Sequence, residues 1–309
     1  MDSLKDWLPI RIWQDAEEWR VDWCWFGDRK LDQPFFRDAV EDALRLPFNQ
    51  AFRRETPLAV LCEWQMPSVK PAAFVYHASR CGSTLIGQML AQLDEMIVLS
   101  EPPPLDALLR GALEPAVRCA ALRGLLAAYG QSRLGSEQSL VVKLDAWSIG
   151  ELPLLHECFP DVPWMFVYRD PLEIAVSHMR RAGIHMVPGI IGPCALDGNS
   201  PGDSREDYIA QRLGRVLDLG LEYCRAFGGL PVNYRELPEA MDGHLAEFFG
   251  LDTAQRNQAL SAAGRHAKQP TQAFVADSQD KHREASDLLR DRVEYWARSA
   301  YDALETVQE

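Results

Sequence analysis

The alternation of apolar and polar residues is clearest between positions 74 and 93, where the chain reads FVYHASRCGSTLIGQMLAQL. Three apolar, β-prone residues come first, and a polar stretch that contains Ser, Arg, Cys and Gly follows them. Beyond this stretch the apolar residues recur at helical spacing: Leu85, Met89, Leu90 and Leu93. The pattern predicts a strand, a tight turn and a helix.

From about residue 72 the same kind of unit recurs along the chain. Short apolar runs predict five strands, at 73–76, 96–99, 139–143, 164–168 and 230–234. Amphipathic stretches predict helices near 114–129, 148–158, 171–182, 205–228, 236–249, 253–263 and 284–305. This alternation is typical of an α/β fold with a largely parallel sheet and helices on both faces, in which ligands bind at the carboxyl ends of the strands. Residues 187–204, rich in Gly, Pro, Asp and Asn, are expected to form a long loop.

Residues 1–70 have a different texture and hold six of the nine tryptophans: Trp7, Trp13, Trp19, Trp23, Trp25 and Trp64. Apolar and polar residues alternate from Trp19 to Trp25, which predicts a half-buried strand, and Pro34 is expected to open a helix that runs to Leu46. We interpret this region as a small N-terminal α+β cap that packs on a main domain at 71–309. Its rings either form the core of that small layer or line a substrate pocket.

Length and composition describe a globular protein with a sizeable core. The chain has 309 residues, of which 47% are hydrophobic and 25% are charged. Its formal net charge of −13 argues against a general nucleic-acid binder and against a binder of anionic membranes. In so acidic a chain, local clusters of Arg and Lys have more weight as anion sites.

Cysteine usage and the N-terminal sequence indicate a cytoplasmic protein. The seven cysteines are odd in number and widely spread, so neither a disulfide framework nor a zinc site is expected. The histidines show no metal-ligand spacing. The first residues, MDSLKDWLPIRIW, carry charges and a Pro where a signal peptide would be apolar, and no apolar run approaches membrane-spanning length. We therefore expect no membrane association.

The turn after the first predicted parallel strand has the features of an anion site. The N–H groups of a first helical turn point into such a loop and the helix dipole adds positive potential, which suits a phosphate or a sulfate. Gly82 lets the backbone approach the anion, and Ser83 and Thr84 add hydroxyl donors. Compared with the Walker A loop, G-x-x-x-x-G-K-[ST], His77 replaces the first Gly and Ser83 stands where the Lys should be. The cation comes earlier instead, at Arg80.

The run S-R-C-G-S-T-L at 79–85 resembles the 5′-phosphosulfate loop of the sulfotransferases that use 3′-phosphoadenosine-5′-phosphosulfate (PAPS). The resemblance implies that six residues of this run hold the 5′-phosphosulfate: Arg80, Cys81, Gly82, Ser83, Thr84 and Leu85. A loop without a Lys after its Gly lacks the usual group for reaching a β/γ-phosphate pair, yet it can grip one phosphate that carries a sulfuryl group. The alternative is an ordinary turn between a strand and a helix, with a Ser cap.

A second match, at 166–181, reads FVYRDPLEIAVSHMRR. A buried strand ends at Arg169, and the Pro that follows suits the first turn of a helix. Ser177 and Arg181 are four residues apart and are expected on one face of that helix, where they and Arg169 converge on one anion. The spacing from 169 to 177 resembles the 3′-phosphate motif of the PAPS-dependent sulfotransferases. The alternative is a helix capped by Asp170, with solvated Arg side chains.

Two further strand ends supply carboxylates and a cation. Glu101 follows the second predicted parallel strand, and a general base is needed because an acceptor hydroxyl must lose its proton as it attacks sulfur. In the tyrosylprotein sulfotransferases and similar bacterial enzymes, a Glu at that place is the base. Lys143 ends the third strand, and the resemblance implies that it counters charge on the bridging oxygen as the bond to sulfur breaks. The alternatives are a helix-capping Glu101 and a solvent-facing Lys143.

The sequence departs from the cytosolic sulfotransferases at Asp145. In those enzymes the corresponding run is K-x-H, and its His is the base. The departure favours Glu101 as the base and leaves Asp145 as the alternative base, as a residue that binds the acceptor or fixes the loop, or as a partner in an ion pair. Tyr234, in the segment V-N-Y-R-E-L, stands where the family has a Tyr near the nucleotide, so it is a candidate for nucleotide binding or for core packing.

The resemblance covers roughly residues 72–305 and implies a P-loop-like α/β fold. It also implies an enzyme that transfers a sulfuryl group from PAPS to the hydroxyl or amine of a small molecule or peptide, without a metal. One rival is an ATP-dependent phosphotransferase of a related fold, for which the Walker Lys is missing. The other is a non-catalytic nucleotide-binding module.

Overall fold

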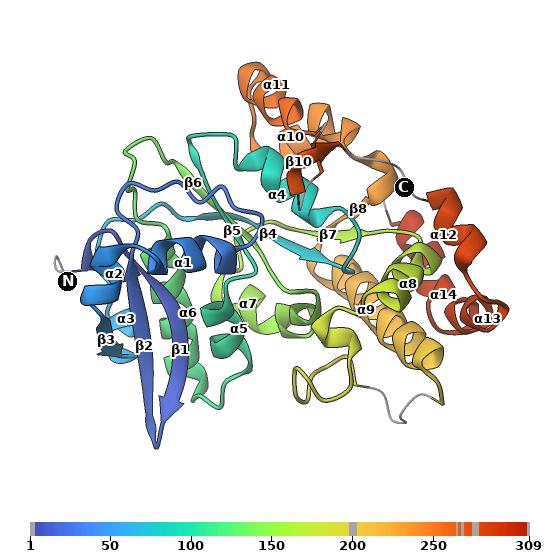
Figure 1. The fold of residues 1–309 in the computed structure, drawn as a ribbon, viewed down its shortest axis with the longest axis horizontal. Coiled ribbons are helices and arrows are strands. Elements are labelled where there is room, and N and C mark those ends of the chain that lie inside the picture. Colours follow the sequence, from blue (N-terminus) through green and yellow to red (C-terminus); the bar gives the residue numbers. More distant parts are fainter. Residues whose placement is uncertain (1–3, 198–202, 264, 267–268, 274–277, 308–309) are drawn as a thin grey trace.

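The centre of the protein is a five-stranded parallel sheet, seen edge-on in the computed structural model of Figure 1. The structure describes residues 4–197, 203–263, 265–266, 269–273 and 278–307. The strand order is β5-β6-β4-β7-β8, and every neighbouring pair is parallel. The strands are β4 Pro71–His77, β5 Met96–Ser100, β6 Ser139–Lys143, β7 Trp164–Tyr168 and β8 Leu230–Asn233. All five strands predicted from the apolar runs are therefore confirmed, and so is the α/β fold class.

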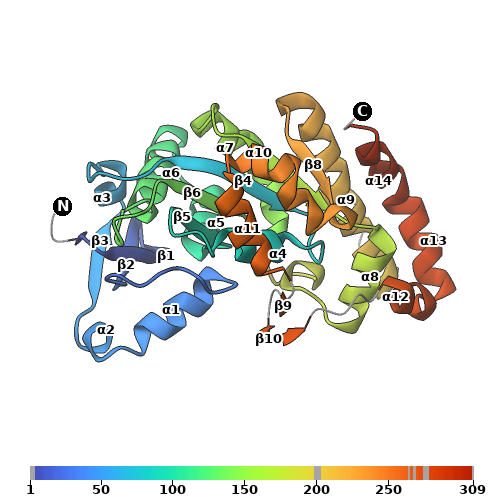
Figure 2. The same cartoon turned by 90° about the horizontal axis from the view of Figure 1, so that it is seen from above.

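Helices cover both faces of this sheet, as the two cartoon views show (Figures 1 and 2). One face carries α4 Ser83–Leu90, α10 His244–Phe249 and α11 Thr253–Ser261. The other face carries α5 Pro103–Arg110, α6 Pro115–Tyr129, α7 Leu152–Cys158 and α9 Arg205–Phe227. In α9 a glycine permits close approach, because a Cβ on Gly220 would come within 2.3 Å of the Phe166 ring of β7.

Three predicted helices are interrupted. The stretch 148–158 begins in the 3₁₀ helix η2 Ala146–Glu151 and becomes α-helical only in α7. The stretch 236–249 holds two short 3₁₀ turns, η4 Tyr234–Glu236 and η5 Glu239–Asp242, before α10 begins. Pro238 lacks a backbone N–H and Gly243 precedes α10, so a continuous helix does not form there. The stretch 284–305 is divided between α13 Asp287–Trp296, which Ser286 caps, and α14 Arg298–Glu305.

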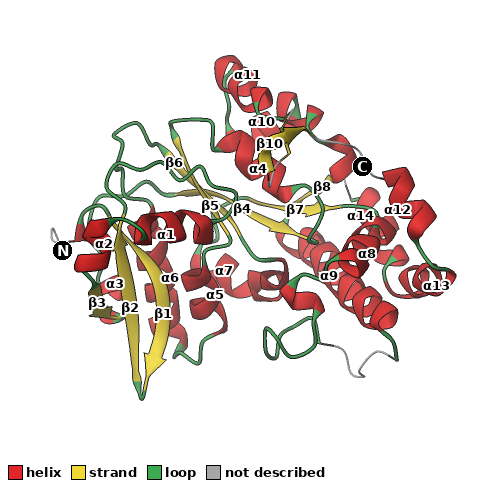
Figure 3. Ribbon diagram, viewed as in Figure 1, coloured by secondary structure: helices red, strands yellow, loops and turns green. Residues whose placement is uncertain are grey.

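The remaining elements follow the carboxyl ends of the strands or belong to the last part of the chain. Figure 3 colours helices, strands and loops differently. After β6 comes η2 Ala146–Glu151; after β7 come α8 Pro171–Arg180 and η3 Ile184–Met186. Near the C-terminus are β9 Arg265–His266, β10 Gln269–Ala273 and α12 Ser278–Glu284. The predicted loop at 187–204 is irregular as far as residue 197, and it continues into α9 from residue 203. No helix within the described part of the chain has both the length and the apolar character needed to cross a membrane.

The N-terminal region forms an antiparallel sheet of β1 Trp7–Asp15, β2 Glu18–Trp25 and β3 Arg54–Pro57. Three short helices accompany it: α1 Phe36–Leu44, α2 Pro47–Ala51 and α3 Ala59–Cys62. Strand β2 and helix α1 are confirmed, whereas β1 and β3 were not predicted. The Pro and Arg inside β1 break its apolar run, and β3 is only four residues long.

This N-terminal layer packs directly on α6. The Tyr129 hydroxyl donates to the Pro9 carbonyl at 2.8 Å, and Gln131 Nε2 donates to the Trp7 carbonyl at 2.9 Å. At Gly124 the two backbones nearly touch, because a Cβ there would come within 1.7 Å of the Leu61 carbonyl oxygen. The apolar side chains of the layer and those of the main sheet belong to one continuous core.

We predict that Gly124→Ala loosens this packing and lowers the free energy of unfolding by about 1–3 kcal/mol, the usual cost of forcing extra atoms into a packed interface. Urea denaturation measures the change. Ala116→Ser, at an exposed position of the same helix, is the control and should leave the midpoint unchanged. Equal stability of both variants would contradict the close contact.

Candidate active site

Three adjacent strands end in side chains that can bind or polarise an anion. Strand β4 ends at His77, β6 ends at Lys143, and Arg169 follows β7 directly. Because β6 and β7 flank β4 in the sheet, these residues share the carboxyl edge, where open α/β sheets bind their ligands. All three side chains are buried.

The loop between β4 and α4 has a strained backbone. Ser79, Arg80 and Gly82 all have positive φ, at 62°, 53° and 87°. The Ser79 amide donates to His77 Nδ1 at 3.0 Å, and Cys81 Sγ donates to the Val167 carbonyl at 3.0 Å. Left-handed backbone at non-glycine residues costs free energy and is concentrated at ligand-binding sites, so this turn has the character of a binding loop.

Of the predicted loop residues, Gly82, Ser83 and Thr84 form the start of α4, whereas the Cys81 side chain is turned toward β7. Gly82 is the N-cap of α4 and provides no side-chain cap, and Ser83 and Thr84 lie buried in the first helical turn. The Leu85 amide already donates to the Gly82 carbonyl at 2.8 Å. The thiol of Cys81 is turned toward β7, and burial raises its pKa to about 11, so it is a structural group and not a nucleophile.

The structure brings the two predicted anion motifs into direct contact. Arg80 Nη2 donates to the backbone carbonyl of Arg181 at 2.9 Å, although the two residues are 101 positions apart. Burial, and then the charge of Arg181, lowers the pKa of the Arg80 guanidinium. Two cations this close favour an anion between or beside them.

Ser177 and Arg181 lie one turn apart at the end of α8, because the Arg181 amide donates to the Ser177 carbonyl at 3.1 Å. Helix α8 ends at Arg180, and Arg181 is its C-cap with an extended backbone, φ −149° and ψ 103°. The ring of His178 accepts a hydrogen bond from the Gly183 amide at 3.1 Å, which closes the helix end and turns the chain away. Arg181 is exposed and Ser177 is half-buried. Asp170 caps α8 as the alternative interpretation expected, since it accepts from the amides of the first turn.

Arg169 is held by a carboxylate that the sequence interpretation missed. Its guanidinium pairs with Glu173, one helical turn further on, and Nη2 donates to Ser278 Oγ of α12 at 3.3 Å. It also lies over the ring of Tyr234, 4.0 Å from the ring centroid. The same ring faces the loop, because a Cβ on Gly82 would come within 2.7 Å of it. Tyr234 therefore bridges the β4–α4 loop and Arg169.

Glu101 meets Lys143 at the neighbouring strand ends. The buried Lys143 ammonium pairs with Glu101 Oε1, and His77 Nε2 lies 3.3 Å from the same oxygen. His77 Nδ1 accepts from a backbone amide, so its proton is on Nε2, which faces Glu101 and the Leu144 carbonyl at 3.0 Å. The carboxylate does not cap α5, whose N-cap is Pro102 without a side-chain hydrogen bond. Glu101 has φ 55°, a further strained position at this edge.

The two candidate bases have opposite electrostatics. Burial by itself raises the pKa of Glu101, but the Lys143 charge and the contact with His77 outweigh burial and hold that pKa well below its ordinary value. The pKa of Asp145 is raised well above its ordinary value by burial and then by the charges of Glu101 and Asp106. Glu101, and not Asp145, thus forms the ion pair with Lys143. Asp145 is half-buried at the start of η2, and its carboxyl has no ion pair or hydrogen bond with a described residue.

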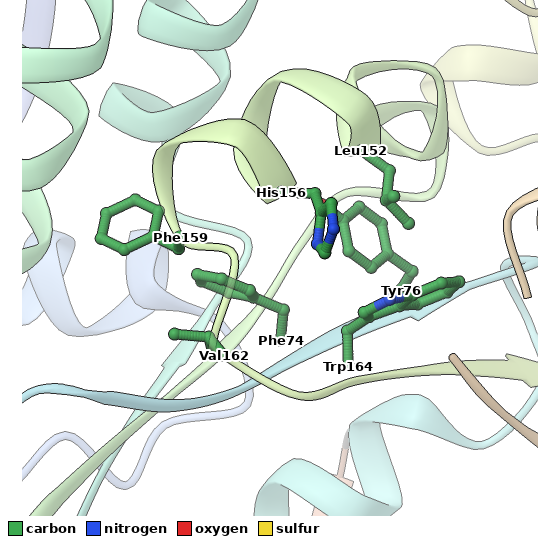
Figure 4. Close-up of a pocket in the computed structure, with 7 residues that line it drawn as sticks. All are labelled: Phe74, Tyr76, Leu152, His156, Phe159, Val162 and Trp164. Atoms are coloured by element: carbon green, nitrogen blue, oxygen red, sulfur yellow. The ribbon is translucent and has the colours of Figure 1, made fainter. Parts of the chain in front are cut away.

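The His, Cys, Asp and Glu side chains of the described residues form no group of three or more that could hold a metal ion. A hollow on the other side of β4 is lined by seven mostly aromatic or aliphatic residues: Phe74, Tyr76, Leu152, His156, Phe159, Val162 and Trp164 (Figure 4). Its cavity volume of about 10 Å³ holds no more than about one water molecule.

The fold and this edge define an α/β protein whose candidate site gathers cations and loop amides at the ends of parallel strands. No family model matches the sequence, and no curated protein matches it. A similar solved structure is the sulfotransferase domain of the Synechococcus PCC 7002 olefin synthase, 16% identical over 80% of this chain and 98% of that domain, with a TM-score of 0.44.

Two more solved structures belong to the same comparison. The sulfotransferase domain from the curacin biosynthetic pathway is 15% identical over 74% of this chain and 98% of that domain, with a TM-score of 0.46. A sulfotransferase from Alicyclobacillus acidocaldarius is 16% identical over 77% of this chain and 96% of its own, with a TM-score of 0.45. At this level of likeness, the assignment of a function depends on the residues of the site itself.

We predict that Gly82→Val abolishes binding of adenosine 3′,5′-bisphosphate and leaves the circular dichroism spectrum native-like. The new side chain would meet the Tyr234 ring and would need a backbone with φ 87° that β-branched residues avoid. Titration calorimetry measures the loss. The control is Gly87→Ala in the same helix, where the nearest atom to the new Cβ is 3.3 Å away. Unchanged affinity in Gly82→Val would mean that the anion binds elsewhere.

We also predict that Asp145→Asn stabilises the protein at pH 8 and not at pH 4. Below the ordinary pKa of Asp, about 3.9, the carboxyl is protonated in both folded and unfolded chains and contributes nothing. As the pH rises through the elevated folded pKa, ionisation beside Glu101 and Asp106 costs stability, while Lys143 and Arg110 offset only part of that cost. The melting temperature of Asp145→Asn should therefore exceed that of the wild type by a margin that grows from pH 4 to pH 8. A margin that stays the same at every pH would contradict the raised pKa.

Proposed function

We propose that the protein is a PAPS-dependent sulfotransferase. The observation that carries the proposal is the contact between two anion motifs, one after β4 and one after β7, through Arg80 and the Arg181 carbonyl. A ligand with one phosphate in the strained loop and a second phosphate near Arg169 and Arg181 matches a nucleotide phosphorylated at both the 5′ and the 3′ positions. PAPS and its product, adenosine 3′,5′-bisphosphate, have that pattern.

Separate sets of residues bind the two phosphates of the nucleotide. Gly82, Ser83 and Thr84 bind the 5′-phosphate with amide and hydroxyl donors, and Arg80 adds positive charge. Arg169, Ser177 and Arg181 bind the 3′-phosphate, and Tyr234 orients Arg169 through the face of its ring.

In the reaction, the acceptor oxygen forms a bond to sulfur while the bond from sulfur to the bridging oxygen breaks. The electron pair of that bond leaves with the 5′-phosphate, where Lys143 stabilises the developing charge. The acceptor proton goes to Glu101. The two side chains contact each other at adjacent strand ends, so Lys143 would move from Glu101 toward the bridging oxygen before the two act on opposite sides of the sulfuryl group.

The ion pair between Lys143 and Glu101 couples nucleotide binding to base strength. While Lys143 holds Glu101, the carboxylate is a weak base because its pKa is low. When a phosphate draws the Lys143 ammonium toward itself, Glu101 loses its strongest partner and its pKa rises. The base would therefore become effective only when the sulfuryl donor is bound.

A bisphosphate preference tests the nucleotide assignment. We predict that adenosine 3′,5′-bisphosphate binds at least tenfold tighter than ADP or AMP. Arg169→Ala should lose about 1.5–3 kcal/mol of bisphosphate affinity, the scale of a charge-assisted hydrogen bond, and should bind ADP as before. Titration calorimetry with the three nucleotides decides the matter, and equal affinity for ADP and the bisphosphate in the wild type would exclude a 3′-phosphate site.

The companion variant is Glu173→Gln, which leaves Arg169 in place and removes the carboxylate that neutralises it. Its bisphosphate affinity should rise while that of Arg169→Ala falls. This opposite pair separates a role of Arg169 in binding from a general loss of structure.

The identity of the base is tested by Glu101→Gln and Asp145→Asn. We predict that Glu101→Gln loses 10²- to 10⁴-fold in single-turnover rate while its bisphosphate affinity is retained, and that Asp145→Asn loses less. The assay uses PAPS and an acceptor found by screening. An inactive Asp145→Asn beside an active Glu101→Gln would exchange the two roles, which the raised pKa of Asp145 would then explain.

A further inference from the structure

His77 ends β4 at the point where the β4–α4 loop, Glu101 and the exit from β6 meet. Its ring is buried. On one side Nδ1 accepts a hydrogen bond from the Ser79 amide at 3.0 Å. On the other side Nε2 faces the Leu144 carbonyl at 3.0 Å and Glu101 Oε1 at 3.3 Å. One buried ring therefore joins three segments of the carboxyl edge.

The two neighbours of the ring determine where its proton lies. A backbone amide can only donate, so Nδ1 has no proton, and Nε2–H is the donor that the Leu144 carbonyl and Glu101 share. In such a three-centre hydrogen bond two acceptors share one proton. His77 is therefore not itself the base, because its only acceptor nitrogen already holds the Ser79 amide.

The backbone around the ring is fixed. The Leu144 amide donates to the Val75 carbonyl at 3.0 Å, which holds the exit from β6 beside β4. Ser79 and Glu101 both have positive φ, at 62° and 55°. Strain of this kind is concentrated at functional sites and persists only where surrounding contacts hold it. The two strained residues meet at the ring of His77, one through its amide and the other through its carboxylate.

The two oxygens of the Glu101 carboxylate have different surroundings. The Lys143 ammonium and His77 Nε2 both contact Oε1. Oε2 makes no hydrogen bond and no ion pair with any residue in the described part of the chain. The Glu101 side chain is 24% exposed and that of His77 is 6% exposed, so a substrate can reach the carboxylate but not the ring. The carboxylate is thus anchored through one oxygen and open at the other.

We propose that His77 is a positioning residue, which holds Oε1 of Glu101 so that Oε2 receives the proton of the acceptor. The proposal rests on the proposed function, because it takes Glu101 as the base. When a phosphate draws Lys143 away, the contact with His77 remains and keeps the carboxylate in place. The acceptor oxygen then bonds to sulfur, and the bridging bond breaks toward the 5′-phosphate. The acceptor proton goes to Oε2, and Nε2 of His77 keeps its own proton.

Two substitutions separate the two contacts of the ring. In His77→Asn the amide oxygen takes the place of Nδ1, so it can accept from the Ser79 amide but offers no donor to Glu101. In His77→Gln the amide nitrogen takes the place of Nε2, so it can donate to Glu101 but leaves the Ser79 amide without its acceptor.

The first measurement is the pKa of Glu101 in a Lys143→Met background, which removes the stronger partner of the carboxylate and leaves His77. The signal is the ¹³C resonance of glutamate labelled at its side-chain carboxyl, and Glu101→Gln assigns it. His77→Asn should raise the pKa of Glu101 by about one unit, because a hydrogen bond to the charged form is lost. His77→Gln should leave this pKa close to that of the background.

The other titratable groups that face Glu101 do not disturb this comparison. The pKa of His185 is lowered to about 3 by burial and then by the charges of His77 and Arg212, so its ring stays neutral above that pH. Asp145 also faces Glu101, but it is the same in all the proteins compared, and the glutamate label excludes its signal.

The second measurement combines the single-turnover rate with the affinity for adenosine 3′,5′-bisphosphate in the otherwise wild-type chain. His77→Asn should lose about 10- to 100-fold in rate, the scale of a misplaced catalytic group, and should keep its bisphosphate affinity. His77→Gln should recover most of the rate, while its bisphosphate affinity falls about three- to tenfold because the loop loses a hydrogen bond. In a Glu101→Gln background, His77→Asn should cause almost no further loss of rate, because it acts through the carboxylate.

The matched control is His156→Asn, the same substitution at a histidine of the hollow on the other side of β4 (Figure 4). It should change neither the pKa of Glu101, nor the rate, nor the bisphosphate affinity.

An unchanged pKa of Glu101 in His77→Asn would overturn the positioning role, as would a His77→Gln variant that is as slow as His77→Asn. Equal losses of rate from His77→Asn with and without Glu101→Gln would overturn it too, since the ring would then act independently of the base. Failure of the wild type to bind the bisphosphate would instead count against the proposed function, whereas the pKa measurement needs no nucleotide. The two hypotheses therefore fail in different measurements.

Discussion

The need to neutralise two buried cations organises the carboxyl edge of the sheet. Lys143 and Arg169 are 1% and 6% exposed at the ends of the two strands that flank β4, and an unpaired charge at such depth would be very costly. Glu101 and Glu173 supply the counter-charges. Each pairing also fixes a segment: Glu101 sets the strained exit from β5, and Glu173 binds Ser278 at 3.1 Å and so docks α12 on α8.

Much of this architecture could be predicted from the sequence, because buried parallel strands are continuous apolar runs and the strand–turn–helix pattern at 74–93 is unambiguous. The predictions that failed concern the ends of helices and the short strands of the N-terminal layer. Helix α8 ends at Arg180, where the Gly183 amide donates to the His178 ring, and not at residue 182 as predicted; no periodicity reveals that end. Strand β1 was not predicted because its Pro and Arg interrupt the alternation of apolar and polar residues.

The site was predictable in its parts and not in its pairings. The loop residues and Arg169 followed from spacing, yet Glu173 was visible as an i, i+4 partner of Arg169 and was overlooked. Sequence order suggested that Asp145 would be drawn into an ion pair, two residues beyond Lys143. Asp145, however, lies beyond the end of β6. Ser100 of β5 stands opposite Lys143 in the sheet and the Glu101 amide donates to the Lys143 carbonyl at 2.8 Å, so the ammonium pairs with Glu101 across the sheet. His77 gave no signal beyond its position, because its role depends on contacts from three separate segments.

Internal neutralisation of both cations would also let the protein discriminate against abundant small anions. A lone phosphate or sulfate ion could displace only one of the two carboxylates, and it would have to compete with a partner that is covalently tethered beside the cation. A ligand that carries two anionic groups on one rigid frame engages both cations together, so its second contact forms at a high effective concentration. Such a chelate effect would discriminate against simple salts by valency alone, before any contact with the base is made.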